Sequence, residues 1–267
     1  MKKLVYILTV VLLLLVFCVS AFFVGRYIIE SREQAAQNAA LADLKNSIKN
    51  SETKPTVPQE TDPEGTFGAE EIRDENGMLI EYGEMYAKNP DLVGWIRIDG
   101  TKLDNPVVQS PDNPNFYLKH DFYGNYSDWG TIYAREECDI NEPSDNITLY
   151  GHNMKDGSMF TSLNPYTSQE TWEKNPLIFF DTLYEYHVYK IFAVFKTSAN
   201  LGEGFTYHNM IDASDKEEFD AFIAKCKELS FYDTGITPQY GVKTICLSTC
   251  EYSLDNGRLV VAAVRIS

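Results

Sequence analysis

A cysteine and an arginine eight residues apart form a pair that could do chemistry. Cys250 ends a strand-like run, Thr244–Thr249, and Arg258 opens the next run, Leu259–Ile266. If these two runs pair as neighbouring strands across the turn between them, both side chains lie on one rim of the sheet. A free cysteine thiol has a pKa of about 8.5, so only a few per cent is thiolate at neutral pH. A nearby cation would favour the thiolate, or stabilise the negative charge that develops on attack.

Among the four histidines, His152 is the candidate acid or base for that thiol. It follows a strand-like run and Gly151, which permits a sharp turn, so it lies at a strand end where it can face a cleft. His187 lies in an alternating strand pattern, for which an exposed position is expected. His120 and His208 lie among aromatic residues, which predicts packed, hydrogen-bonded side chains. Cysteine, histidine and arginine together suit acyl transfer through a thioester, although their spacing alone does not bring them together.

The other cysteines predict neither a disulfide framework nor a metal centre. Cys18 lies in an apolar N-terminal run, and the spacing of the remaining cysteines is irregular. Cys246 and Cys250 would share one face of a strand about 13 Å apart, which is too far for a bridge. The sequence has no Cys-x-x-Cys pair and no His/Cys cluster with zinc spacing. Cys226 falls on the apolar face of a predicted helix, which favours a buried structural role.

The N-terminus has the pattern of a membrane anchor. Residues 1–3 (Met-Lys-Lys) precede an uncharged apolar run, Leu4–Val24, which is long enough to cross a bilayer as a helix. The two lysines predict a cytoplasmic N-terminus, with the rest of the chain outside. A cleaved signal peptide is the alternative, because Val19–Ala21 resembles a cleavage site. The apolar run continues beyond that point, which favours an uncleaved anchor.

A stalk and linker, residues 25–66, are predicted to join the anchor to a folded domain, residues 67–267. The composition of Glu30–Asn50 predicts a polar helix or stalk. Ser51–Gly65 is proline-rich and polar, which predicts a linker that cannot pack a core. The chain is 44% hydrophobic, enough for a real core, and its net charge of −16 argues against nucleic-acid binding.

The pattern of the folded domain is mainly β, and it predicts an eight-stranded barrel. A helix is expected over Ile72–Ala87, stopped by Asn89-Pro90. Ser214–Glu217 reads as a capping box before an amphipathic helix laid against the barrel. The predicted strands are Gly94–Ile98, Pro106–Gln109, Thr131–Ala134, Ile147–Tyr150, Leu177–Asp181, Glu185–Thr197, Thr244–Thr249 and Leu259–Ile266.

Three strings, in this order, resemble the motifs of the sortases, the cysteine transpeptidases of Gram-positive bacteria, and of class B in particular: TLYGHNMKDGSMF, CLSTCEY and NGRLVVAAV. NPDLVGWIRIDGTKLDNPVVQ and DNPNFYLKHDFYG are similar to the same class, and the late capped helix matches its extra helix. The resemblance begins near Leu79. One departure is Cys246, where the family usually has threonine, and we expect a packing change there.

The resemblance implies a role for each matched residue. Cys250 would attack the carbonyl of a threonine in the C-terminal sorting signal of an exported protein. His152 would protonate the leaving amine and deprotonate the incoming one, and Arg258 would hold the substrate and stabilise the oxyanion. The residues implied to contact substrate are Ser248, Thr249, Glu251, Asn113 and Leu118. No cofactor or metal is implied, because class B generally lacks the calcium site of class A.

The acceptor amine is left open by the sequence. The resemblance implies a peptidoglycan-precursor amine, which would attach the exported protein to the cell wall, but some class B enzymes polymerise pilins through a lysine. A non-enzymatic exported binding domain is a further alternative, though it would leave Cys250, His152 and Arg258 unexplained. A papain-like peptidase would place its cysteine before its histidine, contrary to the order here.

Overall fold

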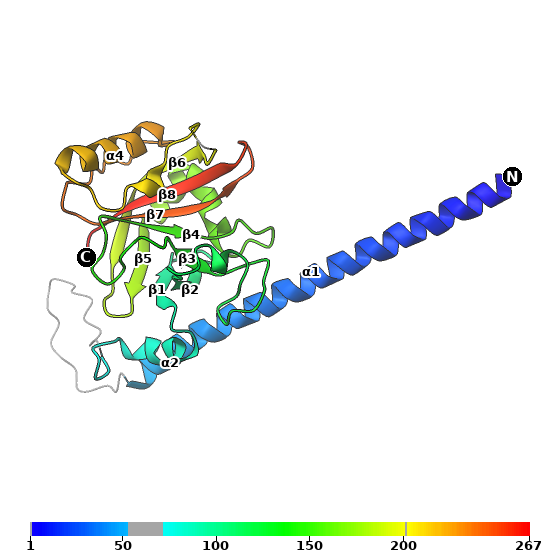
Figure 1. The fold of residues 1–267 in the computed structure, drawn as a ribbon, viewed down its shortest axis with the longest axis horizontal. Helices are drawn as coiled ribbons and strands as arrows, with labels where there is room; N and C mark the ends of the chain where they lie inside the picture. The colour runs from blue at the N-terminus through cyan, green and yellow to red at the C-terminus, as the bar shows by residue number, and fades with distance from the viewer. Residues whose placement is uncertain (1, 53–71, 201) are drawn as a thin grey trace.

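Eight strands close into a barrel in the computed structural model, which describes residues 2–52, 72–200 and 202–267 (Figure 1). Around the barrel the order is β1-β2-β3-β4-β7-β8-β6-β5. The strands are β1 (Leu92–Arg97), β2 (Asp104–Val108), β3 (Ile132–Ala134), β4 (Asn146–Tyr150), β5 (Leu177–Thr182), β6 (Val188–Ser198), β7 (Thr244–Glu251) and β8 (Gly257–Arg265). Each predicted strand overlaps one of these, so the mainly β barrel is confirmed.

Two of the eight strand pairings are parallel, and one of them positions the site. β2 pairs with β3 and β4 with β7 in parallel, while the other six neighbours are antiparallel. A parallel pair brings the carboxyl ends of both strands to the same rim. The residues that follow Tyr150 therefore lie beside the end of β7.

Side chains alternate between the barrel interior and an outer layer along each of these strands. On β7, Ile245 and Leu247 are fully buried in the interior cluster, with Ile147 of β4 and Val261 of β8. Cys246 points the other way, into a second buried cluster beneath α4 (Lys216–Leu229). Cys246 is fully buried there, so the departure from threonine is accommodated by packing.

The helix α4 covers the outer face of the barrel as predicted, but its cap is displaced by one residue. Asp215, not Ser214, is the N-cap, and its carboxylate accepts the Glu218 N–H at 3.0 Å. The Glu218 carboxylate accepts from the Ser214 N–H at 2.8 Å and from its hydroxyl at 2.7 Å. Glu218 therefore takes the place that the prediction gave to Glu217, and its carboxylate binds the residue before the N-cap, so the predicted box at Ser214–Glu217 is wrong in register.

The helix predicted over Ile72–Ala87 is shorter than expected. Helix α2 spans Ile80–Lys88, and Asn89 ends it with an extended backbone. Before it, the Asp74 carboxylate accepts the N–H groups of Asn76 and Met78, and Gly77 adopts a φ of +78°. These bonds form a turn that competes with the helix, as Asp and Gly commonly do.

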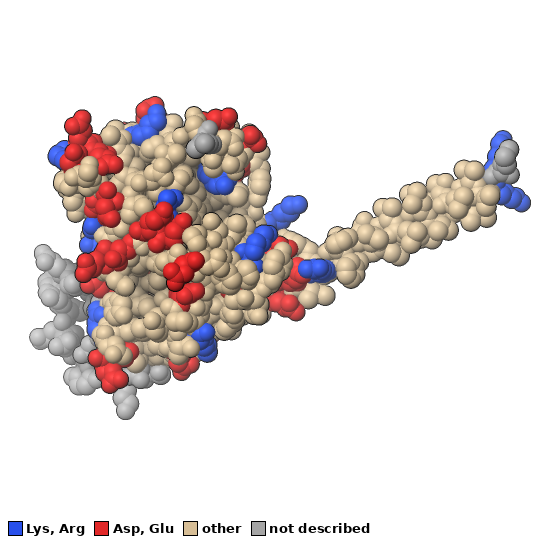
Figure 2. Space-filling model, viewed as in Figure 1, with Lys and Arg blue, Asp and Glu red and all other residues tan. Residues whose placement is uncertain are grey.

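The anchor and the predicted stalk form one continuous helix, α1 (Lys2–Glu52). Its first part projects away from the barrel as a rod that is uncharged beyond the lysines at its tip (Figures 1 and 2), and it is long and apolar enough to cross a membrane. Its second part packs on the barrel, where Gln34, Leu41 and Lys45 are buried. The folded unit therefore includes residues that the sequence pattern assigned to the stalk. The linker from Thr53 onward and the predicted domain start at Phe67 lie outside the described residues.

The long crossover from β4 to β5 holds elements that the sequence did not indicate. A 3₁₀ helix, η2 (Phe160–Thr167), runs into the short helix α3 (Gln169–Lys174). Two further 3₁₀ turns are η1 (Phe116–Leu118) and η3 (Tyr207–Asn209). His187 lies just before β6 and is buried, so its predicted exposed position is wrong.

Replacing Leu41 tests whether α1 is part of the folded unit. Leu41 is 1% exposed and packs in the cluster with Trp95 and Tyr82. We expect Leu41→Ala to cost about 2–5 kcal/mol and to lower the melting temperature of the full chain in detergent micelles by about 4–20 °C. Asn46→Ala, at an exposed position of the same helix, is the control. An identical melting temperature for both variants would contradict the docked position of α1.

Candidate active site

Cys250 and Arg258 are directly opposite each other on neighbouring strands. In the antiparallel β7–β8 pair, Cys250 is the register partner of Arg258, and Glu251 that of Gly257. Opposite residues of such a pair project to the same side of the sheet. The thiol is half-buried and lies on the outer side of the barrel, two residues after Ser248 and four after Cys246. The sequence prediction of a shared rim is thus met by the strand register.

His152 is brought to the same rim by bonds between β4 and β7. The Thr249 hydroxyl donates to the Gly151 carbonyl at 2.8 Å, and the Gly151 N–H donates to the Ser248 carbonyl at 3.2 Å. These bonds extend the parallel pair by one residue and fix the backbone immediately before the histidine. His152 and Cys250 then line the same cavity.

Gly151 is required by packing at this corner. A Cβ on Gly151 would lie 2.8 Å from two ring carbons of Phe160, a fully buried side chain. Its φ is not positive, so the close approach of the ring, rather than a left-handed turn, explains the glycine. The sequence singled out Gly151 for a sharp turn, whereas the structure explains it by the close approach of the Phe160 ring.

A single backbone carbonyl orients the His152 ring. Nε2 of His152 lies 2.7 Å from the carbonyl oxygen of Leu118 in η1. Because a carbonyl only accepts, Nε2 carries the hydrogen, and Nδ1 is left as the nitrogen for proton exchange. Burial lowers the pKa of His152 below its usual 6.5, and the Leu118 carbonyl opposes this in part. The resting imidazole is therefore neutral at pH 7.

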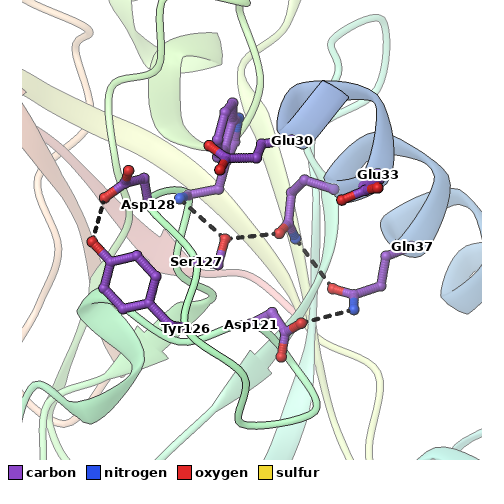
Figure 3. Close-up of a pocket in the computed structure, with 9 residues that line it drawn as sticks. Glu30, Glu33, Gln37, Asp121, Tyr126, Ser127 and Asp128 are labelled. Atoms are coloured by element: carbon purple, nitrogen blue, oxygen red, sulfur yellow. Dashed lines mark hydrogen bonds between the residues drawn. The ribbon is translucent and has the colours of Figure 1, made fainter. Parts of the chain in front are cut away.

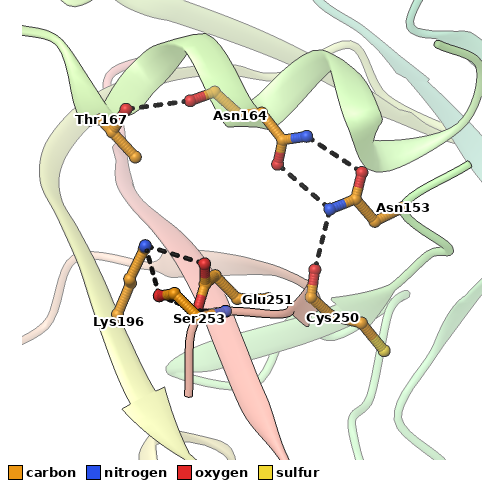
Figure 4. Close-up of polar contacts among 7 residues, drawn as sticks. All are labelled: Asn153, Asn164, Thr167, Lys196, Cys250, Glu251 and Ser253. Carbon is orange, nitrogen blue, oxygen red and sulfur yellow. Dashed lines mark hydrogen bonds and ion pairs between the residues drawn. The ribbon is translucent and has the colours of Figure 1, made fainter. Parts of the chain in front are cut away.

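Asn153 is a site residue that the sequence analysis missed. Its side-chain amide donates to the Cys250 carbonyl at 3.0 Å, and it exchanges hydrogen bonds with the amide of Asn164 in η2 at 3.0 and 3.3 Å (Figure 4). Asn153, which follows His152, therefore links the His152 loop to the backbone of Cys250. The only sequence signal was its place beside that histidine.

The cavity beside Cys250 has a volume of about 550 Å³. It lies between the rim and the segment that leads from β6 to α4. Its aromatic walls come from Tyr133, Tyr150, Phe205 and Tyr207, and Arg258 and His208 also line it. Burial lowers the pKa of His208, and the nearby positive charges of Arg135 and Arg258 add to this. The cavity therefore has aromatic walls, and both Cys250 and the positively charged Arg258 line it.

The Arg258 guanidinium also holds the turn that joins β7 to β8. It donates to the Gly257 carbonyl at 2.9 Å and to the Asn256 side chain at 3.1 Å. Asn256 has a φ of +46°, and a Cβ on Gly257 would lie 2.5 Å from the Glu251 carbonyl. Among the described residues no carboxylate pairs with Arg258, so its charge is available to an anionic group in the cavity.

The five residues expected to contact substrate fall into two groups. Leu118 and Thr249 line the cavity. Ser248 is buried against the Tyr207 hydroxyl at 2.5 Å, and Glu251 pairs with Lys196 at 2.8 Å (Figure 4). Asn113 is exposed in the turn before η1, and its carbonyl accepts the Phe116 N–H. These last three residues lie outside the cavity lining.

A metal site is not formed by the side chains that the structure describes. In residues 2–52, 72–200 and 202–267, no group of three or more His, Cys, Asp or Glu side chains could hold a metal ion. Cys138 and Cys226, like Cys246, are buried, and burial raises the pKa of the Cys138 thiol to about 11. Cys250 is the cysteine that lines the cavity.

The barrel thus places a thiol at the end of β7 and an imidazole at the end of β4 beside one cavity, an arrangement suited to thiol-dependent acyl transfer. The sortase domain family model matches residues 96–266. The chain is 31% identical to sortase B of Listeria monocytogenes over 72% of this chain and 74% of that protein. It is 32% identical to sortase B of Staphylococcus aureus over 66% of this chain and 70% of that protein.

Solved structures of class B sortases share the fold. A substrate complex of S. aureus sortase B superposes with a TM-score of 0.74 at 25% identity, covering 90% of this chain and 99% of that one. Sortase B of Bacillus anthracis, in complex with AAEK1, gives a TM-score of 0.70 at 28% identity over 90% and 99% of the two chains. The chain belongs to the sortase family, class B, and is a cysteine transpeptidase.

Adding one methyl group at Gly151 tests the packing of the rim. We expect Gly151→Ala to cost about 1–3 kcal/mol, because the Phe160 ring must shift, and to reduce transpeptidase activity. Gly151→Ala combined with Phe160→Leu removes the clash and should recover part of the activity. Thermal unfolding and steady-state kinetics measure both effects. Full activity in the single variant would contradict the close approach.

The protonation of His152 can be followed directly by NMR. With ¹³C-labelled histidine there are four ring signals, and His152→Gln assigns the one that matters. We expect this signal to titrate below pH 6.5, because burial disfavours the imidazolium. The unfolded chain then binds the proton first as pH falls, so stability that is fully present above about pH 6.5 is lost below it. A pKa at or above 6.5 would contradict this.

Proposed function

We propose that this transpeptidase cuts a C-terminal sorting signal after threonine and joins the exported protein to a cell-wall amine, with Cys250, His152 and Arg258 as its catalytic residues. The observation that carries the proposal is the shared rim. Cys250 faces Arg258 across β7–β8, while the Thr249–Gly151 bond brings His152 beside the end of β7. Three groups from separate parts of the chain thus meet at one cavity.

The first half-reaction forms a thioester. The Cys250 thiol passes its proton to Nδ1 of neutral His152 as the sulfur attacks the threonine carbonyl carbon, and the carbonyl electrons move onto oxygen. Arg258 stabilises that oxyanion, since its guanidinium lines the cavity without a carboxylate partner in the described residues. When the C–N bond breaks, Nδ1–H of the His152 imidazolium donates its proton to the leaving amine. Leu118 supports the imidazolium through the bond at Nε2.

The second half-reaction resolves the thioester with an incoming amine. Neutral His152 accepts a proton from that amine as the amine nitrogen attacks the thioester carbonyl, and the sulfur leaves as the thiolate. The thiolate then takes this proton from His152. The new peptide bond joins the exported protein to the acceptor, and the enzyme returns to its starting state. The lowered pKa of His152 suits this base step, because the neutral ring is the resting form.

The location follows from the anchor. We place the N-terminus, with Lys2 and Lys3, in the cytoplasm, residues 4–24 in the membrane and the barrel outside. The long apolar helix supports a single-pass anchor. Both partners of the reaction, an exported protein and a wall precursor, are then on the same side of the membrane as Cys250.

The test uses the full chain in detergent micelles, because α1 packs on the barrel. Sorting-signal peptides, including Asn-Pro-x-Thr-x sequences, are mixed with candidate amines, and mass spectrometry detects cleavage after threonine, the thioester on Cys250 and the ligated product. We expect Cys250→Ala to abolish cleavage. His152→Ala should reduce it by about 10²–10⁴-fold and Arg258→Ala by about 10²–10³-fold.

Cys18→Ala is the matched control, since it removes the exposed cysteine of the anchor and leaves Cys250 in place. It should retain full activity. Ligation to a pilin lysine in preference to wall-precursor amines would replace wall attachment by pilus assembly. Full activity of His152→Ala or Arg258→Ala would overturn the assigned roles.

A further inference from the structure

Two loops fix the position of His152, and each is held by hydrogen bonds to other parts of the chain. The first contains η1, whose Leu118 carbonyl binds the ring, and continues to Gly130. The second starts at His152 and returns at Phe160, whose N–H donates to the His152 carbonyl at 3.0 Å. An isolated bridge between Asn153 and Met159 closes this second loop. The position of the histidine therefore depends on what fixes these loops.

Asp156 lies at the tip of the second loop and is fixed from three directions. Its carboxylate accepts from the Ser158 hydroxyl at 2.6 Å, from the Trp129 ring N–H at 2.8 Å and from the Ser31 hydroxyl at 2.7 Å. Burial alone would raise its pKa, but these hydrogen bonds bring it below the usual range. Trp129 belongs to the first loop and Ser31 to α1. One carboxylate thus joins both loops to the anchor helix.

The same face of α1 also binds the first loop. The Ser127 hydroxyl donates to the Gln34 side chain at 3.1 Å, and the Gln37 side chain donates to Asp121 at 3.1 Å (Figure 3). These contacts border a polar cavity of about 310 Å³ between helix and loop. The Tyr27 ring packs on Trp129, with their centroids 5.3 Å apart. The contacting residues recur at helical spacing, so they form one stripe.

Further along the helix, the stripe is held firmly on the barrel. Leu41 is buried, and the Lys45 ammonium lies 4.3 Å from the Trp95 ring centroid and 3.8 Å from Asp104. Lys49 pairs with the buried Glu81 at 3.7 Å. Because the helix is fixed at this end, Ser31 and Gln34 keep a constant position relative to the two loops.

We propose that the juxtamembrane stretch Tyr27–Gln37 of α1 positions His152, acting through Ser31 on Asp156 and through Gln34 and Gln37 on the loop that contains Leu118. The inference rests on the proposed catalytic role of His152. Neither the stretch Tyr27–Gln37 nor Asp156 lines the cavity at Cys250. They act on the orientation of the imidazole and leave substrate binding unaffected.

The experiment compares Ser31→Ala and Asp156→Ala with the unmodified full chain in micelles. We expect kcat to fall by about 5- to 100-fold, because small displacements of a catalytic group are costly, while KM stays within twofold. The ring signal of His152 should move in both variants. Ser31→Thr, which keeps the hydroxyl, should restore both readouts.

Ser47→Ala is the matched control on the same helix, because this serine is exposed and, among the described residues, its hydroxyl bonds to the Leu44 carbonyl of its own turn. It should behave as the unmodified chain. A lower melting temperature with kcat and the His152 signal unchanged would overturn the proposal in favour of a purely structural contact. A fall in kcat without movement of the His152 signal would overturn the route through the histidine.

The two proposals fail in distinguishable ways. If His152→Ala is fully active, the catalytic assignment fails, whatever the ring signals show. If His152→Ala is inactive but Ser31→Ala and Asp156→Ala leave kcat unchanged, the positioning role fails alone. Movement of the His152 signal without loss of kcat also counts against it.

Discussion

The register of β7 against its two neighbours is the constraint on which the rest of the site depends. β7 runs antiparallel to β8, which sets Cys250 opposite Arg258, and parallel to β4, which sets Ser248 opposite Tyr150. A slip of one residue would turn the Cys250 side chain into the barrel interior, where Leu247 now packs. Packing on both faces of β7 opposes that slip, because Ile245 and Leu247 fill the barrel interior while Cys246 packs in the buried layer beneath α4. The hydrophobic core thus fixes the chemistry of the rim.

The residues at the rim are held mainly by hydrogen bonds to backbone carbonyl groups. Thr249 and Asn153 each bond to the backbone across β4 and β7, and the Leu118 carbonyl orients the histidine. Backbone acceptors suit this task, because their position is set by secondary structure rather than by a flexible side chain. The cysteine and histidine are consequently held by the ends of two parallel strands and one 3₁₀ turn.

The sequence predicted the barrel, and the pairing of Cys250 with Arg258, because the signals for both are local. Strand-like runs and strong breakers located all eight strands, and the string around Cys250 and Arg258 placed the thiol and guanidinium on neighbouring strands. The position of His152 after a strand and Gly151 made it the candidate histidine, but no local pattern could bring it near Cys250. That contact depends on the parallel β4–β7 pair, whose partners are separated by about 100 residues of chain.

What the sequence did not reveal depends on packing between distant segments. The turn at Asp74–Gly77 shortened a predicted helix because side-chain bonds to the backbone competed with it. Asn153 bonds to a carbonyl 97 residues away, and such a partner has no local signal. The polar face of α1 was taken for a solvated stalk, since Gln34 and Lys45 are typical of exposed helices. In the structure their polar groups are satisfied by the barrel, so their burial is not costly.

The continuous helix α1 links the membrane to the site by a short and rigid path. With residues 4–24 in the bilayer, Ser31 follows Val24 by seven residues, which is about 10 Å along a helix. Its hydroxyl contacts Asp156, so the loop of His152 lies close to the end of the apolar segment that we propose as the membrane anchor. A flexible tether would give the same average distance without a fixed orientation, and it would leave the two loops around His152 without the support of α1. The packing of α1 on the barrel therefore relates the proposed membrane segment to the support of the two loops around His152.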